Sequence, residues 1–516
     1  MEIQLNTEDS DLVNVCSNDI TPEKINTHIS ARTSEFESVR KHFDRALEGD
    51  FGVCYISGPP GIGKTYFIRQ AVREMGPDDL TFAYGKFRQH DEKPLIAISE
   101  VLEQITKYIL TLPQDELHNI KNTLIKLLGS DTQIIVSICP YAAKLFGQQK
   151  NTGAYERLKY RIRRAINQFV SIACEVLFPL VVCIDDLHWA DTPSLDVIEA
   201  LINDRQYLNL YLILAYRDTE ARSARNIEII GKKTASDGEA LYIKLEPLTD
   251  RDIREYMEVL FGHDVPGLDY IVRMIYGLSL GSPLYIREII ALLCQEGIVS
   301  YSDIKKGWAV NTDRINSIRL PKDIEEAISR KLGQIDKEDH RLLCLVACLD
   351  GQAPYDMLAK IIGDDLLLDN RLKRLCSAGL LMQNTDLEAN SIEFIHDTVL
   401  DRVYRDIPDA QRAQLHYDIA TISAEEPEPS PLYIASHLLR SEISLLRIDP
   451  YTWADVLYRA GIETKHTAAI RQAQTIFDLC IRLLSDVEAS KPPMNVRLEM
   501  AECLFLTGRQ EEAKGC

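Results

Sequence analysis

Short apolar runs alternate with amphipathic stretches along the first half of the chain. Helical periodicity predicts helices at Phe36–Leu47, Tyr66–Met75, Leu95–Leu112, Glu116–Leu128 and Tyr155–Ala173. Short apolar runs predict strands at Gly52–Ser57, Leu80–Phe87, Leu177–Ile184, Leu210–Tyr216 and Leu241–Leu245. Because long crossovers join short apolar strands, the pattern predicts a parallel sheet with helices on both faces.

The strand signal almost stops after Pro247, and helical patterns follow. They cover Asp250–Phe261, Leu268–Tyr276, Leu284–Glu296, Asp323–Ile335, His340–Leu349 and Asp369–Ala378. Gly379–Met382 and Ser391–Ile395 then predict a small hairpin, and three helices with a hairpin indicate a winged-helix unit. The proline-rich stretch Glu425–Pro431 predicts a linker.

A weak internal repeat follows the predicted linker. Gly461, Ala473 and Phe477 fit the small and aromatic positions of a tetratricopeptide helix pair. A second pair is indicated by Ala501, Leu504, Gly508 and Ala513. A helical solenoid needs about three repeats to be stable on its own. We therefore expect the chain to be truncated at Cys516, inside the second pair.

Composition narrows the function classes. The chain has 58 Lys and Arg against 78 Asp and Glu, which gives a net charge of −20. Nucleic acids and anionic membranes bind basic surfaces. We therefore expect no membrane contact and no direct nucleic-acid contact for this chain. The basic stretch Lys159–Arg164 is interpreted as a solvated helix face.

Cysteine usage and the N-terminus indicate a cytoplasmic protein. The 12 cysteines are scattered, and no second pair or histidine cluster completes a zinc site beside Cys344 and Cys348. We expect reduced thiols. Met1–His28 has no apolar segment of a signal peptide. The longest apolar stretch, Phe169–Ile184, contains a glutamate and a proline, and so does not predict a membrane span.

A glycine-rich segment follows the first predicted strand. It reads G-x-x-x-x-G-K-T between a strand and a helix, the context that a phosphate-binding loop needs. The glycines let backbone N–H groups surround a phosphate, and the helix N-terminus adds partial positive charge. The expected nucleotide-binding residues are Gly58, Pro59, Pro60, Gly61, Ile62, Gly63, Lys64, Thr65 and Tyr66. Lys64 is expected to reach the β and γ phosphates, and the Thr65 hydroxyl to ligate Mg²⁺. The alternative is a glycine-rich turn that matches by chance.

Two carboxylates end the third predicted strand, at the sheet edge where α/β folds bind ligands. Asp185 is expected to hold Mg²⁺ through water, and Asp186 to orient or deprotonate the attacking water. Alone, the pair would indicate the start of a solvated loop. The next strand ends at Arg217, which we expect to approach the γ-phosphate as a further catalytic residue. A surface ion pair is the alternative for Arg217.

These motifs divide the chain into five expected domains. They are a disordered leader at 1–28, a P-loop ATPase core at 29–246, a helical lid at 247–318, a winged-helix domain at 319–424 and tetratricopeptide-like helical repeats at 425–516. The expected fold class is an α/β P-loop NTPase, with a parallel sheet and helices on both faces. An all-α lid, a winged helix and the start of an α-solenoid follow it.

The acidic strand and its neighbours resemble a known family. Asp185–Leu195 (DDLHWADTPSL) resembles the signature of large AAA-like ATPase modules of the STAND class of signalling ATPases, as found in large sensor histidine kinases. Origin-recognition-like AAA domains are similar. Further resemblances are Tyr216–Asp218, Leu245–Leu248, Gly281–Pro283, Phe394–Asp397 and Trp453–Leu484. Together they cover roughly Ala31–Cys516.

The resemblance implies ATP or ADP with Mg²⁺, and a resting state in which sheet, lid and winged helix close over ADP. It implies that Pro283 borders adenine, that His396 lies near the β-phosphate and that Arg32 is an arginine at the start of the module. From the residues alone, Pro283 can be a first-turn proline and His396 a helix-start histidine bonded to backbone. Asp186 stands where many active AAA ATPases have glutamate, so we expect slow hydrolysis.

The expected function is a nucleotide-operated switch in a signal-transduction protein of the sensor histidine kinase type. The repeats are expected to bind a protein partner. Because one chain assigns no arginine finger, a homo-oligomer is expected on activation. One alternative is an ATP-dependent transcription regulator in which Asp369–Ala378 reads DNA. The other is a scaffold that binds nucleotide without hydrolysing it.

Overall fold

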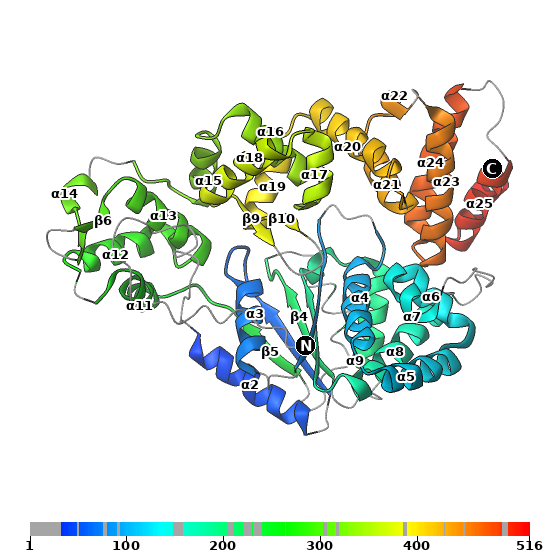
Figure 1. Cartoon of the computed structure of the whole chain (residues 1–516), viewed down its shortest axis with the longest axis horizontal. Coiled ribbons are helices and arrows are strands. Elements are labelled where there is room, and N and C mark those ends of the chain that lie inside the picture. The colour runs from blue at the N-terminus through cyan, green and yellow to red at the C-terminus, as the bar shows by residue number, and fades with distance from the viewer. Residues whose placement is uncertain are drawn as a thin grey trace. The chain divides into compact units, whose positions relative to one another are not determined.

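The structure is a computed structural model of the chain (Figure 1). It describes residues 32–515 except 49–50, 76–79, 90–92, 148–157, 204–209, 220–225, 227–229, 231–239, 264, 303–306, 316–318, 385–389, 428, 447–448 and 488–493. The predicted leader lies outside the described residues. The chain divides into two compact units. One contains residues 32–33, 246–340 and 370–382, and the other contains 34–245, 341–369 and 383–516.

A five-stranded parallel sheet organises the larger unit. Its strands are β1 (Gly52–Ser57), β2 (Thr81–Lys86), β3 (Leu180–Asp185), β4 (Leu210–Tyr216) and β5 (Ala240–Lys244). They follow the order β2-β3-β4-β1-β5, and every pairing is parallel. Each strand overlaps one of the predicted apolar runs, so the predicted α/β fold with a parallel P-loop sheet is confirmed.

Helices cover both faces of this sheet (Figure 1). They are α2 (Thr33–Leu47), α3 (Lys64–Met75), α4 (Ile96–Leu110), α5 (Gln114–Leu128), α6 (Thr132–Ile138), α7 (Ala143–Phe146), α8 (Leu158–Val176) and α9 (Thr192–Asn203). Successive strand residues point to opposite faces. On β1, Val53 and Tyr55 share a core with α4 to α9, whereas Cys54 and Ile56 share one with α2 and α3. The strands are therefore apolar on both faces, which explains their continuous apolar runs.

The unit that contains residues 246–340 is mainly helical. Its helices are α11 (Asp250–Phe261), α12 (Leu268–Ser279), α13 (Pro283–Gln295), α14 (Thr312–Ile315) and α15 (Ile324–Leu332). The lid was expected to be all-α, but β6 (Val299–Ser302) and β7 (Gly307–Val310) form an antiparallel hairpin in it. Trp308 on β7 packs edge-on against Phe261. These strands are too short for their pattern to be distinctive.

The region predicted as a winged helix contains more elements than expected. Its helices are α16 (Lys337–Cys348), α17 (Tyr355–Ile362), α18 (Asp365–Ser377), α19 (Asp397–Asp406) and α20 (Asp409–Ala424). Its strands β8 (Gln352–Pro354), β9 (Leu381–Asn384) and β10 (Ser391–Phe394) form a sheet in the order β8-β10-β9. The two hairpin strands were predicted, whereas α17, α19, α20 and β8 were not. The winged-helix assignment stays a prediction.

Within its described residues, the C-terminal part contains helices and no strand. Its helices are α21 (Pro431–Leu438), α22 (Ile443–Leu446), α23 (Pro450–His466), α24 (Ile470–Val487), α25 (Met494–Leu506) and α26 (Gln510–Gly515). A Cβ on Gly461 would lie 2.4 Å from Phe477 Cε1, so the glycine lets α23 pack closely on α24. Ala420 of α20 shares a core with α21 to α25, so the proline-rich stretch does not separate two cores. The tetratricopeptide assignment stays a prediction. None of the helices in the described ranges is long and apolar enough to cross a membrane.

A side chain on Gly85 would collide with α4. An added Cβ would lie 2.1 Å from the backbone oxygen of Ala97, which cannot move without moving the helix. We predict that Gly85→Ala destabilises the protein by roughly 1–3 kcal/mol, measured as a lower urea midpoint. Gly277→Ala is the matched control, because nothing lies within 4 Å of its added Cβ and alanine favours helix. Equal losses in the two variants would contradict the prediction.

Candidate functional site

The loop between β1 and α3 has the backbone that a phosphate cradle requires. Gly61 and Gly63 have φ values of 73° and 90°, in the left-handed region that other residues rarely adopt. Ile62 between them is buried and anchors the loop. Helix α3 then begins at Lys64, so its N-terminal N–H groups and its dipole lie next to the loop. The predicted residues from Gly58 to Thr65 thus form one continuous loop and helix start.

Lys64 folds back onto this loop. Its Nζ donates hydrogen bonds to the backbone oxygens of Gly58 (2.9 Å) and Pro59 (3.1 Å). Burial lowers the pKa of Lys64, although nearby carboxylates oppose that shift. An ammonium group held in this way can exchange the loop carbonyls for phosphate oxygens. Tyr66, the third residue of α3, is 39% exposed, and its contact with a nucleotide stays a prediction.

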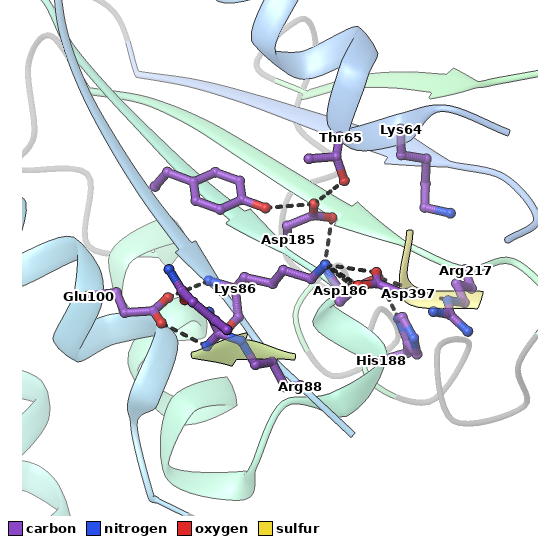
Figure 2. A network of polar contacts seen from close by, with 12 residues as sticks. Lys64, Thr65, Lys86, Arg88, Glu100, Asp185, Asp186, His188, Arg217 and Asp397 are labelled. Carbon is purple, nitrogen blue, oxygen red and sulfur yellow. Dashed lines mark hydrogen bonds and ion pairs between the residues drawn. The ribbon is translucent and has the colours of Figure 1, made fainter. Parts of the chain in front are cut away.

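Asp185 accepts three hydrogen bonds at the end of β3 (Figure 2). Thr65 Oγ1 donates to its Oδ2 at 2.6 Å, and Tyr84 Oη donates to the same oxygen at 3.0 Å. The backbone N–H of Asp186 donates to Oδ1 at 2.8 Å. The structure therefore brings together the two residues that the sequence predicted as Mg²⁺ ligands. A hydroxyl and a carboxylate are suitable ligands for Mg²⁺, which binds oxygen atoms. Phosphates and water usually complete its coordination shell.

Asp186 combines an unusual backbone with a buried carboxylate. Its φ of 53° is left-handed, and the 3₁₀ turn Leu187–Trp189 follows it. Its Oδ2 lies 3.5 Å from Lys86 Nζ, and its Oδ1 lies 3.9 Å from Arg217 Nε. Burial, reinforced by Asp185, raises the pKa of Asp186 to about 7, against the opposing effect of Lys86. A carboxylate with a pKa near neutrality has the basicity that proton abstraction from water requires.

Lys86, the last residue of β2, brings a cation into this site. It lies beside Asp185 in the sheet register, and its Nζ donates to both carboxylate oxygens of Asp397, at 2.9 and 2.7 Å. Burial opposes the charge of Lys86, but Asp397 and Asp186 outweigh burial and raise its pKa. Lys86 in turn lowers the pKa of Asp397, although burial acts the other way. Figure 2 shows the lysine shared between Asp186 and the first residue of α19.

Side chains of α4 hold the end of β2 in place. Glu100 accepts hydrogen bonds from the backbone N–H of Lys86 (2.8 Å) and from Arg88 Nη1 (2.8 Å). Gln104 Oε1 accepts from the backbone N–H of Tyr84 at 3.1 Å. Because β2 is an edge strand, these side chains satisfy backbone groups that no further strand can pair. They thereby fix the direction in which Lys86 enters the site.

Arg217 directly follows β4 and lies near carboxylates of both the sheet and α19. Its side chain is 12% exposed, which argues against the surface ion pair that the sequence left open. Asp401, one turn after Asp397, has a pKa that burial raises and Arg217 lowers. Arg217 therefore lies near Asp186 and also interacts electrostatically with Asp401. Its contact with a γ-phosphate stays a prediction.

Three residues that the family resemblance alone singled out lie in different places. Arg32 donates through Nη2 to the backbone oxygen of Glu246 at 3.3 Å. Pro283 is the first residue of α13, as the first-turn interpretation predicts. Both belong to the unit that contains residues 246–340. His396 directly precedes α19 in extended backbone and is therefore next to Asp397. Their contacts with a nucleotide stay predictions.

Sequence reasoning missed Lys86, Tyr84 and His188, and it gave Asp397 no role. A lysine that ends an apolar strand was the available signal for Lys86. His188 lies within the quoted signature, and its ring is fully buried with Nδ1 3.8 Å from Asp186 Oδ1. Nothing in the local sequence relates Lys86 to Asp397, because 311 residues separate them.

Asp186 is expected to make stability depend on pH. Its raised pKa means that the folded protein keeps the Asp186 proton up to about pH 7, whereas the unfolded chain releases it near pH 3.8. The contribution of this group to stability therefore falls as pH rises between these values.

We predict that Asp186→Asn raises the thermal midpoint over the parent protein at pH 8, by at least about 1 kcal/mol in stability. The gain should shrink toward pH 5. Calorimetry over a pH series measures it, with Asp44→Asn, an exposed aspartate on α2, as the control. A gain that is the same at every pH would count against the assignment.

Residues 29–214 match the family described as AAA ATPase domain. The chain is 22% identical over 400 residues to hybrid signal transduction histidine kinase G of Dictyostelium discoideum, over 65% of this chain and 12% of the relative. It is 18% identical over 312 residues to peroxide stress-activated histidine kinase mak3 of Schizosaccharomyces pombe. That alignment covers 58% of this chain and 13% of the relative. The alignments thus span about an eighth of the length of these relatives.

A similar fold occurs in a solved structure. It is a Signal Transduction ATPase with Numerous Domains (STAND) protein with a tetratricopeptide repeat sensor from Pyrococcus horikoshii. The likeness covers 94% of this chain and 62% of that one, with 13% identity and a TM-score of 0.50. At this identity it shows a shared fold. The resemblance found in the sequence is therefore confirmed: residues 29–214 match the family described as AAA ATPase domain, and the fold is similar to that of a STAND protein.

Proposed function

We propose that the chain is a nucleotide-operated switch that binds ATP and ADP with Mg²⁺ and hydrolyses ATP slowly. The observation that carries the proposal is the shared lysine. Lys86 Nζ lies 3.5 Å from Asp186 Oδ2 at the candidate nucleotide site and 2.7 Å from Asp397 Oδ2 at the start of α19. One cation thus links the phosphate-binding end of the sheet to a helix 311 residues further along the chain.

The P-loop and its neighbours would bind the nucleotide. The loop N–H groups and Lys64 would hold the β and γ phosphates. Thr65 Oγ1 and the Asp185 carboxylate would hold Mg²⁺, which neutralises phosphate charge when bound. To reach a phosphate, Lys64 would leave the backbone oxygens of Gly58 and Pro59, to which it now donates. These backbone oxygens would then accept hydrogen bonds from water, which would keep the free-energy cost of the exchange small.

Asp186 would act on the attacking water. It would accept a hydrogen bond from the water, and in hydrolysis the water oxygen bonds to the γ-phosphorus while ADP leaves with the bridging oxygen and its electron pair. Arg217, 3.9 Å from Asp186, would stabilise negative charge on the γ oxygens. Two features favour slow turnover. Asp186 is shorter than the usual glutamate, and Lys86 lies against its carboxylate.

The switch would arise because two anions compete for the same cations. Asp397 now holds Lys86, and Arg217 influences Asp401. A γ-phosphate next to Asp186 would attract both cations and repel both carboxylates of α19. ATP would therefore weaken the interactions of Lys86 and Arg217 with the carboxylates of α19, whereas ADP would leave these interactions intact. Such a difference in affinity between two states is what a ligand needs to shift their populations.

The wider role is inferred from the relatives. The curated proteins that align with this chain are named as histidine kinases, although the aligned part is a small fraction of each. We propose that the chain is a regulatory part of a cytoplasmic signal-transduction protein of the phosphorelay type. In this proposal the helices from α21 onward receive a protein partner, and a homo-oligomer forms on activation.

The basic face of α18 does not favour the DNA-reading alternative. Arg371 Nη2 lies 3.4 Å from Glu338 Oε2, and Arg374 Nη2 lies 2.6 Å from Asp339 Oδ1. Two of the cations that would contact phosphates are therefore already paired with carboxylates of α16. Binding DNA through them would require these ion pairs to break.

Lys64→Ala tests nucleotide binding and turnover directly. Purified parent protein should release bound ADP on denaturation and should hydrolyse ATP slowly in the presence of Mg²⁺. Lys64→Ala should abolish the turnover and weaken ATP binding, because the cation at the β and γ phosphates is lost. Nucleotide analysis and phosphate release measure both. A parent protein that binds ATP without hydrolysing it would leave the scaffold alternative, and one that fails to bind ATP would exclude the switch, the ATPase and that scaffold together.

Asp397→Asn tests the competition for Lys86. Removing this charge should improve affinity for ATP relative to ADP by about five-fold or more, because Lys86 no longer has to leave a carboxylate. Calorimetric titration with each nucleotide gives the ratio. Asp409→Asn, an exposed aspartate on α20, is the control. An unchanged ratio in Asp397→Asn would remove the basis for the switch while leaving nucleotide binding in place.

A further inference from the structure

His188 is a buried imidazole without a hydrogen bond. It is the middle residue of the 3₁₀ turn Leu187–Trp189, and its side chain is 0% exposed. Within the described part of the chain, neither Nδ1 nor Nε2 has a hydrogen-bond partner. A buried polar group left unpaired costs on the order of 1–3 kcal/mol. A histidine here therefore carries a cost that an apolar residue would not, and this calls for an explanation.

The ring faces the carboxylate that we assign to the attacking water. Nδ1 lies 3.8 Å from Asp186 Oδ1, and Figure 2 shows His188 directed toward Asp186 and beside Arg217. This separation is too long for a direct hydrogen bond. It is short enough for one water molecule to hydrogen-bond to both groups, and such water-mediated contacts are common in active sites.

The surroundings of His188 keep its ring neutral. Burial, with Arg217 and Lys64 acting in the same direction, lowers the pKa of His188 to about 3. A neutral imidazole offers one donor nitrogen and one acceptor nitrogen. It can therefore orient a water molecule without adding a positive charge beside Lys64 and Arg217.

We infer that His188 positions the attacking water of ATP hydrolysis together with Asp186. This role rests on the proposed ATP hydrolysis. Asp186 accepts one hydrogen of the water and His188 accepts the other at Nδ1, so that a lone pair of the water oxygen points at the γ-phosphorus. That oxygen bonds to phosphorus as the bond to the bridging oxygen breaks, with its electron pair on ADP. One water proton passes through Asp186 to solvent, and the other stays on the inorganic phosphate. His188 neither gains nor loses a proton.

Substitutions of His188 separate positioning from packing. His188→Phe fills the space without a hydrogen-bonding atom. His188→Asn places an amide oxygen or nitrogen near the position of Nδ1, and His188→Gln places one near the position of Nε2. Each variant is assayed for Mg²⁺-dependent ATP turnover, for ADP and ATP affinity by calorimetry, and for the thermal midpoint of the nucleotide-free protein.

We expect His188→Phe to bind both nucleotides within about three-fold of the parent and to lose roughly 100-fold in kcat. Its thermal midpoint should be unchanged or raised, because the unpaired polar atoms are gone. His188→Asn should recover part of the lost kcat, and more than His188→Gln, since Nδ1 faces Asp186. His42→Phe is the control, because it removes another buried histidine, on α2, which is bonded to Tyr211 Oη. It should lower stability and leave kcat within two-fold.

Several results would overturn this role, and they can be told apart. Parent-like kcat in His188→Phe would make the ring a packing residue. Loss of ADP binding together with kcat would make it part of nucleotide binding or of local folding. If His188→Gln recovered more kcat than His188→Asn, the assignment of the water contact to Nδ1 would be wrong. A parent protein without Mg²⁺-dependent turnover would overturn the hydrolysis proposal itself, and the role of His188 with it.

Discussion

A buried lysine between carboxylates is the interaction on which the site depends. A charge removed from water must have partners, and Lys86 has Asp397 at 2.7 Å and Asp186 at 3.5 Å. Its position follows from the end of β2, which Glu100 fixes through the backbone N–H of Lys86. The close approach of β2 to α4 at Gly85 supports this arrangement. The ion pair thus ties the packing of an edge strand to the chemistry of the acidic strand beside it.

The adjacent carboxylates of Asp185 and Asp186 lie in different environments. Asp185 continues the strand and accepts hydrogen bonds from Thr65, Tyr84 and the next backbone N–H. At Asp186 the backbone turns into the left-handed region, which directs the side chain away from those donors and toward Lys86, Arg217 and His188. One carboxylate is therefore arranged to hold a metal ion, and the other is left with the raised pKa of a group that can take a proton.

Much of the fold could be predicted, because it depends on local pattern. Strands buried on both faces give continuous apolar runs, and the P-loop needs glycines whose backbone angles other residues avoid. The hairpin β6–β7, strand β8 and helix α17 were among the elements that were not predicted, because a segment of three to eight residues has too few positions for its pattern to be distinctive. Gly461 and Phe477 were predicted only in part. Their spacing suggested a helix pair, but only the structure shows that the glycine lies against the aromatic ring.

The sequence by itself determined the parallel sheet, the phosphate loop and the pairing of Thr65 with Asp185. Each of these follows from residues at the end of a strand or the start of a helix, and the carboxyl ends of parallel strands meet at one edge. The tertiary structure alone decided that Lys86 meets Asp397 and that His188 is buried against Asp186. The first contact joins residues 311 positions apart. The second depends on a single backbone turn at Asp186 and on the packing around it. Neither leaves a periodic pattern in the sequence, because charge partners and burial are set by where the chain folds back rather than by neighbouring residues.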